Sequence, residues 1–267
     1  MDKQAVREIS MIGGKTAPTV PADMDRTLIH KTNGFFWDTR GSDLLGTTAF
    51  PRYGAFLTEE KLRLLDDLTG KKVLEIGCGS GQSLQYIGSR RVSELWGLDI
   101  SESQLEMTKK RLAQSGLTAR LICSPMEEAC GIPSDYFDLV YSIYAIGWTT
   151  DLDGTLERIA SYLKRDGVFI FSWSHPIHKC VAMEDHRLFF KKSYFDDSWY
   201  TVTMGGATFS LSDRPLSAYI NALAKAGFSI EQMVEQTDSD LIRGDTSDFA
   251  QKAGMLPVTF VFKARKR

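Results

Sequence analysis

The sequence lacks the cysteine and hydrophobic patterns of several common protein classes. Its four cysteines, Cys78, Cys123, Cys130 and Cys180, show no Cys-x-x-Cys spacing in a chain of 267 residues. This pattern argues against a disulfide framework and against a zinc site. No stretch approaches the length of a membrane span, and no apolar signal-type segment follows the first residues. We therefore expect a cytoplasmic protein with reduced thiols, no membrane span and no metal.

An excess of charge of either sign is also missing. The 32 basic and 34 acidic residues give a formal net charge of -2, so the chain has no overall basic field that would attract nucleic acid. The composition, 43% hydrophobic and 25% charged, is typical of a globular chain with a large core. We expect a small-molecule substrate, no nucleic-acid partner, and a monomer or homodimer.

Three glycines at alternate positions form the most informative segment. Gly77, Gly79 and Gly81 follow an apolar run at residues 73–76 and precede a polar segment that begins at Gln82. Such a pattern predicts a strand, a tight turn and the first turn of a helix, because glycine adopts backbone conformations closed to other residues. Turns of this kind bind nucleotide-like cofactors.

The same segment lacks the spacing of a nicotinamide site. Gly-x-Gly-x-x-Gly would place the third glycine at Gln82. Glu75, two residues before Gly77, would also repel a pyrophosphate. The segment therefore favours a cationic or amino-bearing cofactor over a dinucleotide.

Strands and helices alternate along the rest of the chain. Apolar strands are predicted at 73–76, 95–100, 120–123, 137–142, 168–173, 228–234 and 258–262, and helices at 59–68, 101–115, 152–163 and 215–226. Asp99 follows Glu75 by 24 positions, where an acidic residue that binds ribose hydroxyls is expected. The alternation predicts an α/β fold with a mostly parallel sheet covered by helices on both faces, its last strand antiparallel.

Two aromatic segments flank this core and suggest its organisation. We expect a flexible arm at 1–25, a helical cover or lid at 26–70, and the main domain at 71–267. An insertion at 175–213, with one or two β-hairpins, would act as a substrate cap. The aromatic residues of both segments have a second interpretation as simple hydrophobic cover.

Four motifs in order carry a family resemblance. Residues 75–81 (Glu-Ile-Gly-Cys-Gly-Ser-Gly), 98–101 (Leu-Asp-Ile-Ser), 137–140 (Phe-Asp-Leu-Val) and 163–167 (Leu-Lys-Arg-Asp-Gly) resemble the motifs of the class I S-adenosylmethionine-dependent methyltransferases. Within that class the chain resembles the small-molecule methyltransferase type 11 group, which includes ubiquinone and menaquinone methyltransferases. The resemblance implies a Rossmann-like seven-stranded sheet with the last strand antiparallel, and S-adenosylmethionine as cofactor with S-adenosylhomocysteine as product.

The resemblance also implies roles for individual residues. The amino-acid part of the cofactor would lie at Glu75, Gly77, Cys78, Gly79 and Gly81; the ribose and adenine at Asp99, Ile100, Ser124, Pro125, Met126 and Glu127; and the transferred methyl at Ser142, Ile143 and Tyr144. Many relatives carry aspartate where this chain has Ser124, so either Ser124 or Glu127 contacts the adenine amino group. Trp37 and Trp148 are candidate walls of a substrate pocket, or plain hydrophobic cover.

The resemblance predicts direct in-line methyl transfer to a small molecule, with oxygen, nitrogen and carbon acceptors all open. A hydroxyl acceptor would benefit from a base, and His175 or His178 is best placed along the sequence, although each has a second interpretation as a turn cap. Two other functions remain as alternatives, an RNA or protein methyltransferase and a non-catalytic S-adenosylmethionine-binding module.

Overall fold

A computed structural model describes residues 25–40 and 48–267 of the chain. The arm expected at 1–25 falls, except for its last residue, outside the described residues. A sheet of seven strands runs through the molecule in the order β12-β13-β7-β6-β3-β4-β5. β3 (Lys72–Ile76), β4 (Glu94–Asp99), β5 (Arg120–Cys123), β6 (Phe137–Ile143) and β7 (Leu163–Ser174) are mutually parallel, whereas β13 (Thr259–Lys266) is antiparallel to β7 and to β12 (Phe228–Val234). The predicted Rossmann-like fold is confirmed.

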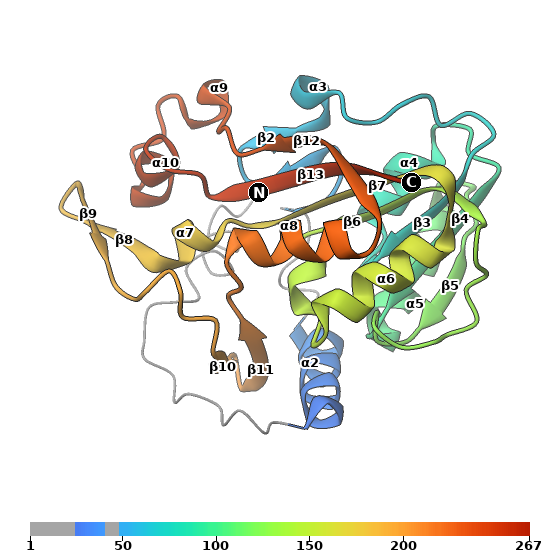
Figure 1. The fold of residues 1–267 in the computed structure, drawn as a ribbon, viewed down its shortest axis with the longest axis horizontal. Helices are drawn as coiled ribbons and strands as arrows, with labels where there is room; N and C mark the ends of the chain where they lie inside the picture. The colour runs from blue at the N-terminus through green and yellow to red at the C-terminus, as the bar shows by residue number, and fades with distance from the viewer. Residues whose placement is uncertain (1–24, 41–47) are drawn as a thin grey trace.

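Helices cover both faces of the sheet (Figure 1). α4 (Gln82–Gly88) and α5 (Glu102–Gln114) pack on one face, and α6 (Leu152–Tyr162) and α8 (Leu216–Lys225) lie side by side on the other. Each face has its own apolar core, because successive strand residues point to opposite sides. In β3, for example, Leu74 packs with the α6 and α8 layer and Val73 with the α4 and α5 layer.

The amino-terminal cover is a single long helix followed by short elements. α2 (Arg26–Arg40) packs against α5 and against β11 (Ala207–Ser212), far from it in sequence. β1 (Arg52–Gly54) and β2 (Leu57–Thr58) then form a small antiparallel pair beside β7 and β13, ahead of α3 (Glu59–Leu62). The cover therefore joins the sheet to the insertion.

The helix predicted at 59–68 is too long by six residues. α3 ends at Leu62, and Arg63 takes a left-handed conformation with φ +50°. The cause is the buried Glu59 carboxylate, which accepts hydrogen bonds from Tyr53 Oη at 2.6 Å and from the amides of Leu64 and Leu65 at 3.1 and 3.0 Å. These bonds fold the chain that follows α3 back over Glu59, the first residue of that helix.

The insertion contains a short helix and two hairpins. α7 (Pro176–Cys180) follows β7, and β8 (Val181–Glu184) pairs with β9 (Arg187–Phe190), as β10 (Trp199–Met204) pairs with β11. α9 (Ser239–Ile242) and α10 (Asp248–Ala253) precede β13, and η2 (Ile146–Trp148) is a single 3-10 turn after β6. The sequence predicts one or two hairpins, and the structure has two.

One further boundary differs from the sequence prediction. β7 begins at Leu163, so residues 164–167 belong to the strand and do not close α6. On α8, the buried residues are Tyr219, Ala222 and Leu223, whereas Ile220 is 36% exposed.

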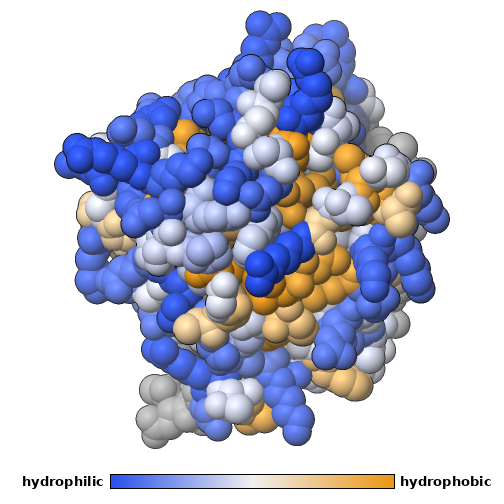
Figure 2. Space-filling model, turned by 90° about the vertical axis from the view of Figure 1, so that its right-hand side faces the viewer, coloured by the Kyte–Doolittle hydropathy of each residue, from blue (hydrophilic) through white to orange (hydrophobic). Residues whose placement is uncertain are grey.

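The edge of the sheet at β5 exposes some apolar surface. Figure 2 views the molecule from this side, where hydrophobic residues gather near the centre and hydrophilic residues surround them.

None of the helices within residues 25–40 and 48–267 has both the length and the hydrophobicity of a membrane span.

Candidate functional site

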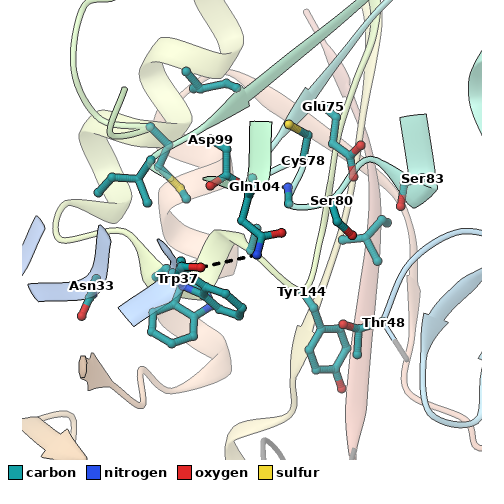
Figure 3. Close-up of a pocket in the computed structure, with 18 of the residues that line it drawn as sticks. Asn33, Trp37, Thr48, Glu75, Cys78, Ser80, Ser83, Asp99, Gln104 and Tyr144 are labelled. Atoms are coloured by element: carbon teal, nitrogen blue, oxygen red, sulfur yellow. Dashed lines mark hydrogen bonds between the residues drawn. The ribbon is translucent and has the colours of Figure 1, made fainter. Parts of the chain in front are cut away.

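A large cavity opens at the carboxyl ends of β3, β4 and β6, where parallel sheets usually bind ligands. It holds about 1190 Å³ of empty space, including the part open to solvent. Its floor is the loop between β3 and α4, and α2 closes one side (Figure 3). Most of the residues predicted for the cofactor line it, namely Glu75, Gly77, Cys78, Gly79, Asp99, Ile100, Ser124, Pro125, Met126, Glu127, Ile143 and Tyr144, together with Trp37 and Trp148.

Close packing explains two glycines of the loop. Gly77 has φ +72°, and a Cβ there would lie 2.2 Å from the Cβ of Ala145 at the end of β6. Gly81 has φ +79°, and its Cβ would lie 2.7 Å from a methyl carbon of Thr108 on α5. Gly81 itself does not line the cavity, so its role is to bring α4 against α5.

The loop already uses three of its backbone amides within the protein. The amides of Gly77 and Cys78 both donate to the carbonyl of Leu98, at 2.7 and 3.0 Å. The amide of Gly79 donates to Asp99 Oδ2 at 2.8 Å. A phosphate site needs such amides aimed at the anion. The loop therefore matches the predicted preference for a ligand that is not a phosphate.

Glu75 is a carboxylate buried at the cavity wall, with 2% of its surface exposed. Burial raises its pKa well above the ordinary value, and hydrogen bonds from Tyr141 Oη at 3.0 Å and from Ser83 oppose that effect. Figure 3 shows Glu75 and Ser83 near each other at one end of the cavity. A cationic ligand group beside Glu75 would compensate the buried charge.

Asp99 is fixed at the end of β4 by backbone donors. Its Oδ2 accepts from Gly79, and its Oδ1 accepts from the amide of Ser101 at 3.0 Å. Burial raises its pKa, and these backbone hydrogen bonds oppose the rise. Each carboxylate oxygen has a further lone pair. Asp99 therefore has acceptor capacity left for ligand hydroxyls at a defined position on the cavity wall.

Glu127 lines the cavity, and its carboxylate also joins α2 to the segment that follows η2. Its Oε1 accepts from the amide of Thr150 at 2.6 Å and from the Thr150 hydroxyl at 2.5 Å, and lies 3.0 Å from His30 Nε2 on α2. Burial raises its pKa, but the hydrogen bonds from His30 and Thr150 outweigh burial and lower it to about 2. Ser124, the other candidate for the adenine edge, donates only to the neighbouring Pro125 carbonyl, at 3.2 Å.

Tyr144 stands where β6 ends, with φ +55°, an uncommon conformation for a residue with a side chain. Its hydroxyl lies 2.5 Å from Thr259 Oγ1, and burial raises its pKa to about 12. Strained backbone of this kind often occurs at functional sites. Ser142, two residues earlier, is fully buried in the strand and does not line the cavity.

A second chamber lies behind Tyr144, between β7, α7, α2 and the β10–β11 hairpin. It holds about 370 Å³, including its opening. Four aromatic residues, Trp37, Tyr144, Trp148 and Trp173, line both it and the first cavity, and Phe36, Ser174, Lys179, Met204, Phe209 and Leu211 complete its walls. The two spaces therefore share one aromatic boundary.

The structure does not bring His175 and His178 to the first cavity or to the second chamber. His175 caps α7, since its Nδ1 accepts from the amide of Ile177 at 3.1 Å, and its Nε2 lies 2.6 Å from Glu235 Oε1. His178 is buried, 2% exposed, and packs edge-on against Phe249. Neither imidazole therefore lies where the sequence placed a base for the acceptor, because both serve the packing of α7.

Several residues that line the cavity are not among the residues predicted from the sequence. Gln104 lies within the cavity on α5, and its side-chain amide donates to the Trp37 carbonyl at 3.4 Å (Figure 3). The backbone amide of Gln104 also donates to Ser101 Oγ at 3.2 Å, which caps the start of α5. His30, Asn33, Thr48, Ala49, Ser80, Gln82, Ser83, Ala145 and Trp173 also line the cavity. No sequence signal marks His30 or Asn33, because only the packing of α2 brings them there.

These residues fit S-adenosylmethionine. The cavity offers a buried carboxylate at Glu75 for an ammonium group, a second carboxylate at Asp99 for ribose hydroxyls, and apolar walls at Ile100 and Met126 for an adenine. The two buried carboxylates and the apolar walls therefore match the charge and polarity of that cofactor.

Comparison with known proteins agrees with the site. A family model described as "Methyltransferase domain" matches residues 74–171. An uncharacterized protein of Haemophilus influenzae is 29% identical over 222 residues, covering 77% of this chain and 85% of that protein. The aklanonic acid methyltransferase DauC of a Streptomyces species is 30% identical, but the match covers 53% of this chain and 63% of that enzyme.

A solved structure shows the same fold over most of its length. It is that of a putative S-adenosylmethionine dependent methyltransferase from Listeria monocytogenes, with a TM-score of 0.67 and 25% sequence identity. The match covers 78% of this chain and 96% of that one.

Proposed function

We propose that this chain, which belongs to the class I S-adenosylmethionine-dependent methyltransferases of the type 11 group, methylates a small-molecule acceptor by direct in-line displacement. The observation that carries the proposal is the boundary of Trp37, Tyr144, Trp148 and Trp173 between the two spaces. A cofactor in the first cavity and an acceptor in the second chamber would meet there. The walls of the chamber are mostly apolar, as the walls of small-molecule sites usually are.

Within this proposal each cofactor residue has a role that follows from its surroundings. Glu75 binds the ammonium group, and Asp99 binds the ribose hydroxyls. Ile100, Pro125 and Met126 contact the adenine ring. The adenine amino group would meet Ser124 or Glu127, which both line the cavity; of the Glu127 carboxylate, Oε1 already accepts from the Thr150 amide and lies 3.0 Å from His30 Nε2.

The protein's part in the reaction is to orient and to exclude water. S-adenosylmethionine supplies an activated methyl on a sulfonium, so in-line placement of the acceptor accounts for much of the acceleration. Aromatic faces near a cation stabilise it by about 0.5 to 2 kcal/mol. Tyr144 is fixed at the boundary by its bond to Thr259, and Trp148 packs against both Trp37 and Trp173. These contacts hold the aromatic rings in place around the reacting centre.

The similarity to a methyltransferase named for aklanonic acid supports a small organic acceptor. The formal net charge of -2 gives no support to an RNA acceptor. The acceptor atom, whether oxygen, nitrogen or carbon, does not follow from the chamber walls.

Calorimetry with S-adenosylhomocysteine tests the cofactor roles. We expect Glu75→Gln to weaken binding at least tenfold, because glutamine keeps the size of the side chain but removes the charge. Glu60→Gln is the matched control, since Glu60 is exposed on α3 and does not line the cavity. Equal affinities of the wild type and Glu75→Gln would overturn the assignment.

Methyl transfer from labelled S-adenosylmethionine tests the acceptor class. Cell extracts are separated into a small-molecule fraction, an RNA fraction and a protein fraction, and each is incubated with the purified enzyme. We expect label in the small-molecule fraction only. Label in RNA or protein, with none in small molecules, would contradict the proposal.

A further inference from the structure

Gln104 is a buried polar residue that faces the first cavity from the first turn of α5. The residue is 2% exposed, and it lines the cavity. The cap of α5 uses its backbone amide and leaves its side chain for other contacts. Buried side-chain amides are normally satisfied by hydrogen bonds. The contacts that Gln104 makes within the protein therefore show what its side chain can still bind.

One end of the Gln104 amide is fixed by the amino-terminal cover. Nε2 donates to the Trp37 carbonyl at 3.4 Å, and because a carbonyl oxygen only accepts, this contact identifies the nitrogen end. The nitrogen carries a second hydrogen. Oε1 has no hydrogen-bond partner among the residues that the structure describes. Gln104 thus retains one N–H donor and one oxygen acceptor for a ligand.

The Gln104 oxygen lies beside the loop between β3 and α4. A Cβ added at Gly79 would lie 3.8 Å from Gln104 Oε1, which is an ordinary contact distance. In Figure 3 the side chain reaches into the middle of the cavity, with its oxygen turned toward Ser80 and away from Asp99. The amide therefore faces the region where the amino-acid part of the cofactor is proposed to bind.

The carboxylate of that amino-acid part needs hydrogen-bond donors. Among the described residues that line the cavity there is no lysine or arginine, and the histidine, His30, is engaged with Glu127. The three amides of the loop, at residues 77, 78 and 79, already donate within the protein. A carboxylate in this region is therefore left with neutral side-chain donors, and Gln104 Nε2 is one of them.

The ammonium group of the same part needs more than one acceptor. An ammonium carries three donors. Glu75 offers a buried carboxylate, which already accepts from Tyr141 and Ser83. A second acceptor near the loop would satisfy a further N–H of the ammonium. Gln104 Oε1 is a neutral acceptor held at that loop.

We propose that Gln104 is a further cofactor-binding residue, whose side-chain amide holds the amino-acid part of S-adenosylmethionine. Oε1 accepts from the ammonium group, and the second N–H of Nε2 donates to the carboxylate. The bond to the Trp37 carbonyl keeps the amide in one orientation. This inference rests on the proposed function, which places the cofactor in this cavity. Gln104 acts in binding and takes no part in the transfer of the methyl group.

Two ligands that differ in the amino-acid part test the inference. S-adenosylhomocysteine has the ammonium and the carboxylate, whereas 5′-methylthioadenosine shares its adenine, ribose and thioether but ends in a methyl. Calorimetry measures both dissociation constants for the wild type and for Gln104→Met, which keeps the length of the side chain and removes its amide. We expect S-adenosylhomocysteine to bind at least about tenfold more weakly, because hydrogen bonds to charged groups are lost. The affinity for 5′-methylthioadenosine should change less than about threefold.

A substitution on the same helix provides the control. Gln114→Met makes the same chemical change at an exposed position of α5 that does not line the cavity, and it should leave both dissociation constants within about twofold of the wild type. Gln104→Leu is a second apolar variant and should show the same dependence on the ligand. Thermal unfolding and the retained affinity for 5′-methylthioadenosine show that each variant is folded.

The outcomes separate this inference from the proposed function. A wild type that binds neither ligand counts against the proposed function. A wild type that binds S-adenosylhomocysteine, with the same affinity in Gln104→Met and Gln104→Leu, counts against the role of Gln104 alone. Equal losses for both ligands in these variants would also overturn that role, because the amide would then serve the ribose or the packing of the cavity.

Discussion

His30 Nε2 on α2 lies 3.0 Å from Glu127 Oε1 in the connection after β5, and the pair joins the amino-terminal cover to the wall of the cofactor cavity. The hydrogen bond to Glu127 raises the pKa of His30, against the opposing effect of burial. The charged imidazole is thus the form that this contact stabilises.

The pair predicts a pH dependence of stability. The folded pKa of His30 is raised above its ordinary value of 6.5, so its contribution is fully present below pH 6.5 and is lost as the pH rises through the raised value. We expect His30→Gln to lower the free energy of unfolding at pH 5.5 by up to about 1 kcal/mol and to flatten its decline above pH 6.5. Urea unfolding between pH 5.5 and 8.5 measures both. His186→Gln, on the exposed β8–β9 turn, is the control, and an unchanged pH profile in His30→Gln would refute the role.

Asp99→Ala should weaken S-adenosylhomocysteine binding. Charge-assisted hydrogen bonds are worth about 1.5 to 3 kcal/mol, so the dissociation constant should rise roughly 10- to 100-fold. Asp138→Ala is the control, because Asp138 also accepts a backbone amide, that of Lys72 at 2.9 Å, but does not line the cavity. It should lower the melting temperature without changing the affinity. Equal affinity losses in the two variants would show that Asp99 acts only through stability.

Gly77→Ala separates a steric requirement from a conformational one. The added Cβ would lie 2.2 Å from Ala145 Cβ, in addition to the cost of φ +72°. Gly116→Ala shares the second cost, with φ +67°, but its Cβ meets nothing within 4 Å. We expect Gly116→Ala to cost about 1 to 2 kcal/mol and Gly77→Ala clearly more. Thermal unfolding checks the order, and equal costs would mean that the approach of β6 to the loop is not constraining.

Glu59→Ala should destabilise the protein by about 2 to 4 kcal/mol, because it leaves the buried Tyr53 hydroxyl and two backbone amides without their acceptor. The exposed neighbour Glu60 provides the control substitution, Glu60→Ala, expected to change stability by less than about 0.5 kcal/mol. Denaturant unfolding distinguishes the two variants. Similar values for both would show that the Glu59 carboxylate does not organise the turn after α3.

Sequence patterns predicted the sheet because each strand and helix of the core has its own periodicity of apolar residues in the sequence. The apolar run before Gly77 belongs to β3, and Asp99 ends β4. These two strands follow one another in the sequence and are also adjacent in the sheet. The errors fall where a distant contact decides the local structure. Residues 63–68 have helical spacing, yet the Glu59 carboxylate ends the helix at Leu62.

The candidate site shows the same difference between residues that local sequence patterns predict and residues that only distant contacts bring together. Glu75, Gly77 and Asp99 were found because strand ends gather at one edge of a parallel sheet. Lys179 and Trp173 were not, because nothing in their spacing shows that β7 and α7 meet the β10–β11 hairpin around a chamber. His175 was singled out for its position after a strand, whereas its ring is held by Ile177 and Glu235.

The aromatic boundary shared by the two spaces has a thermodynamic consequence. Trp37, Tyr144, Trp148 and Trp173 line both spaces, so a shift of these rings when one space is filled would change the shape of the other. Linkage then requires that any factor by which the cofactor alters the affinity for the acceptor is returned unchanged by the acceptor to the cofactor. Because the same four side chains border both spaces, ligands bound in the two proposed sites would be thermodynamically coupled.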